Sequence, residues 1–102
     1  MTRPIAVEVD SFLGRMALVV TGTQSEKPGT IMVRVKSYDG DEASIRIAYK
    51  AGDSPIFVAE RIAAQFQERG FHLLGAEQQK DVVLFRPVLP SKQIATLHVE
   101  VK

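Results

Sequence analysis

Apolar and polar residues alternate along much of this chain. In residues 30–36 and again in residues 44–50, every second residue is apolar, and residues 5–10 and 95–101 repeat the pattern. A period of two is typical of a β-strand that buries one face. The alternation therefore predicts four amphipathic strands.

Two further segments are apolar without alternation. Residues 16–21 and 82–85 are continuous apolar runs rich in valine, which is typical of central strands buried on both faces. We expect strands over residues 71–78 and 81–86, joined by a tight polar turn at Gln79-Lys80. Pro87 and Pro90 then break the chain before the last strand.

The dipeptide Asp39-Gly40 predicts a hairpin between the strands at 30–36 and 44–50. Their apolar faces coincide only if paired residue numbers have an even sum, because a slip of one residue turns every side chain over. We predict Lys36 opposite Ser44, with a three-residue tip at residues 39–41. This register places Arg34 opposite Arg46.

A helix is predicted over residues 55–69. Ser54 suits the N-cap, and Pro55 suits the first helical position, where its missing N–H costs nothing. Apolar residues recur at helical spacing at Val58, Ala59, Ile62, Ala63 and Phe66. We expect Gly70 to end the helix in a left-handed conformation.

These elements predict an α+β fold, with an antiparallel sheet of about five to seven strands and the helix packed on one face. The 102 residues fit one domain over residues 1–102. Within it, residues 1–15 are expected to form a mobile arm or an edge strand, and residues 91–102 to contain the terminal strand.

Composition narrows the functional classes. Apolar residues make up 45% and charged residues 25%, which is typical of a folded protein, and the net charge of +1 indicates no class of partner. The absence of cysteine excludes disulfides and thiolate metal sites. We find neither a secretory signal nor an apolar run of the roughly 20 residues that would span a membrane.

Candidate chemistry is sparse, and we predict no enzyme activity, no catalytic or metal-binding residue and no cofactor. His72 and His98 fall in predicted strands without other metal-ligating residues beside them. Asp39, Asp41 and Glu42 suit a hairpin tip and lack the remaining ligands of a calcium loop. The segment at residues 52–54 precedes a helix, but Asp53 repels an anion and Pro55 removes a donor.

The most interesting cluster is basic. The predicted register brings Arg34, Lys36, Arg46 and Lys50 to one polar sheet face. Like charges directly opposed in a sheet are destabilising, so the cluster is a candidate face for a nucleic acid or an acidic protein partner. A solvated face balanced by nearby acids explains the same residues, and aromatic side chains for base stacking are missing from it.

Residues 17–86 resemble a strand-strand-helix module of contractile-tail sheath proteins and related tail components of bacteriophages. The resemblance is carried by Val20-Thr21-Gly22-Thr23, by Pro28-Gly29-Thr30-Ile31, by Ala51-Gly52-Asp53-Ser54 and by the alanine-rich stretch at residues 58–66. Gly75-Ala76 and the apolar residues 82–85 fit the two strands expected next. In the sheath pattern a small residue takes the place of Pro55, and whole sheath proteins are far longer than this chain.

The resemblance implies a virion structural or assembly module that acts by self-association or docking, in the virion or the host cytoplasm. Its partners would be copies of itself or other phage structural proteins, with no membrane involved. The segments at residues 2–10 and 95–102 are candidates for exchange with neighbouring subunits. The same segments are equally explained as edge strands of one monomer. The alternative function is a binding module that uses the basic face.

Overall fold

The computed structural model describes residues 3–12, 15–23, 27–70 and 72–102, and seven strands of this part form two antiparallel sheets. The four-stranded sheet has the order β1 (Ala6–Phe12), β2 (Arg15–Thr21), β6 (Val82–Pro87) and β5 (Leu74–Gln79). The three-stranded sheet has the order β4 (Glu42–Tyr49), β3 (Gly29–Ser37) and β7 (Ile94–Val101). The predicted α+β class is confirmed, although the strands divide between two sheets.

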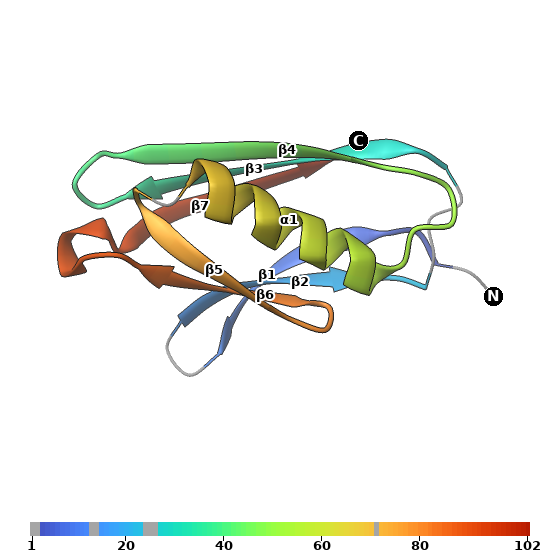
Figure 1. The fold of residues 1–102 in the computed structure, drawn as a ribbon, viewed down its shortest axis with the longest axis horizontal. Helices are drawn as coiled ribbons and strands as arrows, with labels where there is room; N and C mark the ends of the chain where they lie inside the picture. The colour runs from blue at the N-terminus through green and yellow to red at the C-terminus, as the bar shows by residue number, and fades with distance from the viewer. Residues whose placement is uncertain (1–2, 13–14, 24–26, 71) are drawn as a thin grey trace.

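The helix α1 (Pro55–Arg69) lies between the two layers, in front of them in Figure 1. It packs against β4 and β5, which are edge strands of different sheets, and reaches β2 and β6 behind them. Its five predicted apolar residues are all buried. The helix therefore closes one side of the space between the sheets instead of covering one face of a single sheet.

The predicted ends of α1 are correct, and one predicted cap is wrong. The Ser54 side chain accepts a hydrogen bond from the backbone N–H of Phe57, and Pro55 begins the helix. Gly70 has a φ of −111° and is not left-handed. A Cβ atom at Gly70 would lie 3.0 Å from Cδ1 of Phe66 and 3.2 Å from its carbonyl oxygen. A larger residue at this position is therefore limited by space, and not by a left-handed backbone.

The predicted hairpin register is off by two residues, with the correct parity. Lys36 pairs with Glu42 and Arg34 pairs with Ser44, so residues 38–41 form the loop. The backbone N–H of Ser37 donates to the carbonyl oxygen of Asp41, and the N–H of Asp41 donates to Ser37 Oγ. These bonds close the tip at residues 38–40, one residue before the predicted tip, because the polar side chains offer the backbone local partners.

Other boundaries shift by a few residues. The turn between β5 and β6 consists of Lys80 and Asp81, because Gln79 pairs with Val82, and Lys80 has a φ of 55°. The strand expected from residue 71 begins at Leu74, while residue 71 itself lies outside the described part. A short 3-10 helix, η1 (Pro90–Lys92), separates β6 from β7.

One hydrophobic core joins both sheets and α1. Its largest fully buried side chains include Phe66, Phe85, Leu18, Ile31 and Ile62. The rings of Phe66 and Phe85 meet edge to face, with centroids 5.0 Å apart. Side chains at alternate positions of each sheet point into this core, so the opposite faces and the free strand edges remain for interactions.

Candidate interaction site

The core is incompletely covered on the side opposite α1, where the edge strands β1 and β7 lie, and we call this apolar surface the open cleft. These strands approach each other but belong to different sheets. Apolar side chains of β1, β2 and β7 are only partly buried there, in contrast to the fully buried Val33 and Val35 of β3. The partly buried residues of the open cleft are Val7, Met16, Ile94, Leu97 and Val99, and the more exposed Val9 follows Val7 on the same face of β1.

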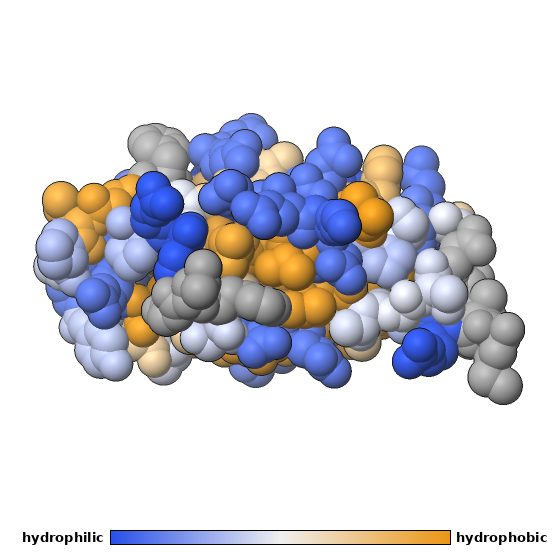
Figure 2. Space-filling view, turned by 90° about the horizontal axis from the view of Figure 1, so that it is seen from below, coloured by the Kyte–Doolittle hydropathy of each residue, from blue (hydrophilic) through white to orange (hydrophobic). Residues whose placement is uncertain are grey.

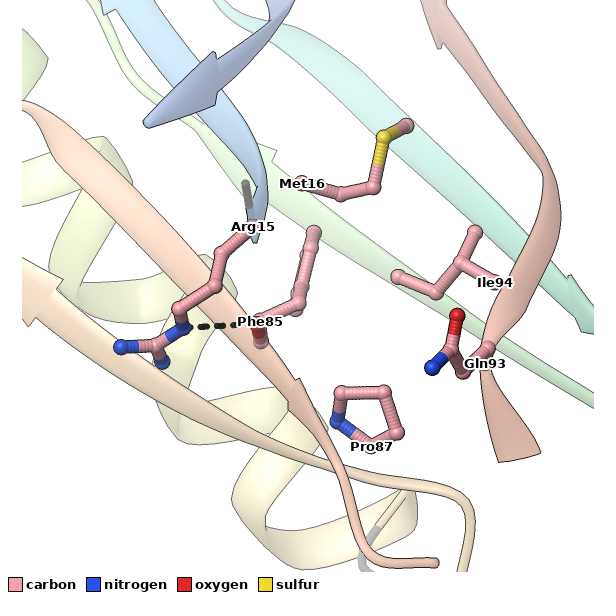
Figure 3. Close-up of a pocket in the computed structure, with 6 residues that line it drawn as sticks. All are labelled: Arg15, Met16, Phe85, Pro87, Gln93 and Ile94. Carbon is pink, nitrogen blue, oxygen red and sulfur yellow. Dashed lines mark hydrogen bonds between the residues drawn. The ribbon is translucent and has the colours of Figure 1, made fainter. Parts of the chain in front are cut away.

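A pocket of about 250 Å³ lies at one end of this cleft. Figure 3 shows Met16, Phe85, Pro87 and Ile94 around it, with the amide of Gln93 beside Ile94 and the guanidinium of Arg15 pointing away from Ile94. Arg15 Nε donates a hydrogen bond to the carbonyl oxygen of Phe85 over 3.3 Å, which orients its guanidinium. The mixture of apolar surface and few polar groups suits an apolar side chain of a protein partner.

The backbone groups of β1 and β7 also have free positions at this cleft. Lys102 exchanges two hydrogen bonds with Thr30 of β3. In an antiparallel ladder, every second residue bonds to the partner strand, so the backbone N–H and C=O groups of Leu97 and Val99 point away from β3. In β2, the backbone N–H of Val20 donates to the carbonyl oxygen of Asp81, on the side of β6. By the same alternation, the backbone N–H and C=O groups of Val7 and Val9 point away from β2. Over their described residues, both predicted docking segments thus contain an edge strand, and residue 2 lies outside the described part.

The outer face of the four-stranded sheet offers a second apolar surface. The register places Val19, Val82 and Leu84 on this face, where they are only partly buried. The prediction that β2 and β6 are central strands is confirmed, but their outer face is buried only in part, since Ala17 is fully buried there and the other three residues are not. The four-stranded sheet is the lower layer of Figure 1, and the view from below shows a hydrophobic band between hydrophilic borders (Figure 2).

The structure corrects the arrangement of the predicted basic face. Arg34, Lys36 and Arg46 are exposed on the outer face of the three-stranded sheet, and Lys50 follows the end of β4. Arg34 is not opposite Arg46, because the two-residue shift sets Arg34 between Ser44 and His98 and sets Arg46 beside Met32. The argument from directly opposed arginines is therefore wrong.

Acidic residues share this face. Glu42 lies directly opposite Lys36. Glu100 of β7 is 3.4 Å from His98 Nε2 and 3.8 Å from Lys102 Nζ. His98 is exposed, as its place in the alternation predicts, whereas His72 lies in a turn before β5 and not in a strand. The face therefore carries mixed charge, which weakens its attraction for a polyanion.

The carboxylates of the hairpin loop have a structural role. Lys92 of η1 forms ion pairs with Asp39, at 2.8 Å, and with Asp41. The Ser37 hydroxyl also bonds to Asp39, and the N–H of Tyr38 donates to the carbonyl oxygen of Gln93. These contacts fasten the loop to the start of β7. The hydrogen bond from Lys92, followed by that from Ser37, lowers the pKa of Asp39 from 3.8 to about 2.

This lowered pKa predicts a loss of stability in acid. A carboxyl whose pKa is lower in the folded state stabilises the fold above its unfolded pKa, and this contribution disappears as pH falls through the folded value. Asp39→Asn should lower the melting temperature at pH 7, and the difference from the wild type should shrink between about pH 4 and pH 2. Thermal unfolding at a series of pH values measures it. Asp10→Asn, at an exposed position of β1, is the control, and a difference independent of pH would contradict the assignment.

The turn before α1 is a cap in this structure. Asp53 Oδ2 accepts a hydrogen bond from the N–H of Lys50 over 2.8 Å, and Gly52 has a φ of 96° that favours glycine. Within the described ranges, no group of three or more His, Cys, Asp or Glu residues could hold a metal ion. The same part of the chain has no helix long and apolar enough to cross a membrane.

Comparison with known proteins identifies no relative: no family model, curated protein or solved structure matches this chain. The bacteriophage resemblance therefore remains a hypothesis. Its first two segments end β2 and begin β3, which lie in different sheets. Sequence reasoning missed the pocket residues Met16 and Ile94. They belong to strands of different sheets that meet only in the folded chain, and no local pattern signals this.

Proposed function

We propose that this chain is a non-enzymatic structural module that assembles with copies of itself, as a component of a phage-type virion or tail. The open cleft is the observation that carries the proposal. Two unpaired strand edges border a row of half-buried apolar side chains. Exposed strand edges readily add a strand from another chain, and apolar side chains beside them increase the gain from burial.

The two edges are compatible with each other in a second copy. Val7 and Val9 of β1 have free backbone groups at the strand edge and side chains that face the cleft. The same is true of Leu97 and Val99 of β7. Pairing β1 of one copy with β7 of the next, in antiparallel fashion, can therefore join Val9 with Leu97 and Val7 with Val99. The backbone ladder and the apolar faces match in the same register.

The charges of the two strands also favour pairing between β1 of one copy and β7 of another. On its other face β1 carries Glu8 and Asp10 and no basic residue. The outer face around β7 carries His98, Lys102 and the neighbouring Arg34, against Glu100. Because β1 and β7 are different surfaces, the contact is head-to-tail, and such contacts form rings or filaments.

Association should depend on concentration, and a charged side chain introduced into the cleft should weaken it. Val9 is 47% exposed, so Val9→Lys should leave the monomer folded but place an ammonium group in the interface. We expect association to weaken about tenfold or more, because a buried unpaired charge is costly. Sedimentation velocity over a concentration series measures it. Val88→Lys is the matched control, since Val88 is 44% exposed in the loop after β6.

A wild-type chain that stays monomeric at the highest attainable concentration would refute the proposal. Assembly that stops at a dimer would contradict the head-to-tail contact and indicate pairing of identical edges. Equal losses in Val9→Lys and Val88→Lys would place the interface elsewhere. Tail or capsid genes beside the gene for this chain would support the virion context, and an unrelated setting would count against it.

The alternative, a basic face for a nucleic acid or an acidic partner, has weaker support. Glu42 and Glu100 lie among Arg34, Lys36 and Arg46, and the face lacks a line of cations that could follow a phosphate backbone. Binding of this kind would weaken steeply with added salt, which a mobility shift at two salt concentrations would reveal.

A further inference from the structure

A polar groove runs between the C-terminal half of α1 and the strand β4, away from the open cleft. It has a volume of about 490 Å³. Gln65 and Arg69 line it from the helix, and the sheet contributes Ser44 and Arg46 beside Met32 and the buried Ile45. Two arginines from different elements thus share one hollow of the surface with a hydroxyl and an amide.

The free edge of β4 faces this groove. The N–H of Ser37 bonds to Asp41, so the alternation of the ladder directs the backbone groups of Ser44, Arg46 and Ala48 away from β3. The Arg61 guanidinium donates to the carbonyl oxygen of Ala48, which places α1 along this edge. Ser44 and Arg46 lie on the same edge of β4 and line the groove, so their backbone N–H groups are further donors at its wall.

The charge of the groove lacks a partner within the described ranges. The ion pairs found there involve Lys92, His98 and Lys102, and neither Arg46 nor Arg69 takes part. Two guanidinium groups held beside one hollow repel each other, and an oxyanion between them would replace that repulsion with charge-assisted hydrogen bonds. Guanidinium groups bind carboxylates and phosphates through paired N–H donors.

We propose that this groove is an oxyanion-binding site for a carboxylate or phosphate group. Arg46 and Arg69 supply the charge from opposite walls, and the Ser44 hydroxyl and the Gln65 amide donate further hydrogen bonds. Arg69 stands in the last turn of α1, where the helix dipole is negative and opposes an anion. Because the groove is open to solvent and the dipole opposes an anion, we expect binding of inorganic phosphate to be weak. The site is independent of the proposed assembly through β1 and β7.

Titration of the full chain followed by amide NMR tests the site. Sodium phosphate forms one arm and an acetylated, amidated glutamate peptide the other, both at constant ionic strength. We expect saturable shifts at Ser44, Arg46, Gln65 and Arg69 in at least one arm. Saturation by phosphate alone assigns a phosphate ligand, whereas saturation by the peptide alone assigns an acidic protein segment. The absence of saturable shifts at these residues in both arms would overturn the proposal.

Matched variants separate the groove from the wider basic face. Arg46→Gln and Arg69→Gln should each weaken binding about fivefold or more, because each removes one charged donor from the site. Both side chains are exposed, so the fold should persist and the remaining amide shifts should not move. Arg34→Gln removes an arginine from the same sheet face outside the groove and should change binding by less than about twofold. An equal loss in Arg34→Gln would show diffuse attraction and overturn the site.

Discussion

Phe66→Ala should be the most damaging single substitution of this chain, with a loss of about 3–5 kcal/mol in the free energy of unfolding. Phe66 is fully buried on α1 and packs edge to face against Phe85, which belongs to the four-stranded sheet. Its removal leaves a cavity where helix and sheet meet. Since a domain of this size is stabilised by only about 5–15 kcal/mol, the melting temperature should fall by more than about 12 °C.

A second phenylalanine of the same helix provides the control. Phe57 is 47% exposed, and its ring lies 5.9 Å from the guanidinium carbon of Arg61. Phe57→Ala should cost less than about 1 kcal/mol, because it removes little buried surface and one exposed cation–π contact. Denaturation by urea measures both variants. Similar losses at the two positions would show that α1 is not fixed to the core as described.

Gly22→Ala should be the second most damaging change, with a loss of about 2–5 kcal/mol. Gly22 follows β2 with a φ of +109°, and a Cβ atom there would lie 2.4 Å from the carbonyl oxygen of Pro4. The added methyl group thus meets both a strained backbone conformation and the segment that leads into β1. Since that segment includes the buried Ile5, the substitution should also loosen the edge strand β1.

Gly40→Ala separates the two causes. Gly40 has a φ of +95°, similar to that of Gly22, but an added Cβ atom would meet nothing within 4 Å. Gly40→Ala should therefore lower the free energy of unfolding only by the backbone strain, roughly 1–2 kcal/mol. Equilibrium unfolding of the two variants gives the difference due to the close approach. If both variants lost the same stability, the contact between Gly22 and Pro4 would not constrain the fold.

The two proposals use separate parts of one architecture. Assembly relies on the side of the core that α1 leaves open, and the oxyanion groove relies on the edge that α1 accompanies. Val9→Lys and Arg69→Gln act on these surfaces independently. A loss of self-association with unchanged anion binding, and the reverse, would therefore establish each surface on its own.

Local chemistry was enough to locate most elements of this protein. The N-cap at Ser54, the proline at position 55 and the spacing of Val58 to Phe66 defined α1 to the residue, because caps and helical periodicity depend on neighbours in the chain. Alternation likewise located β3, β4 and β7 and gave the correct parity for the pairing of β3 with β4. His98 was correctly placed on the polar side for the same reason.

Only the tertiary structure decided how these elements meet. The division of the strands into two sheets and the groove shared by Arg46 and Arg69 depend on residues far apart in the chain. An alternating strand reveals which side chains share a face, but it does not reveal which strand lies beside it or what covers that face. The sequence thus determined the strands and the helix, and packing determined which edges stay open.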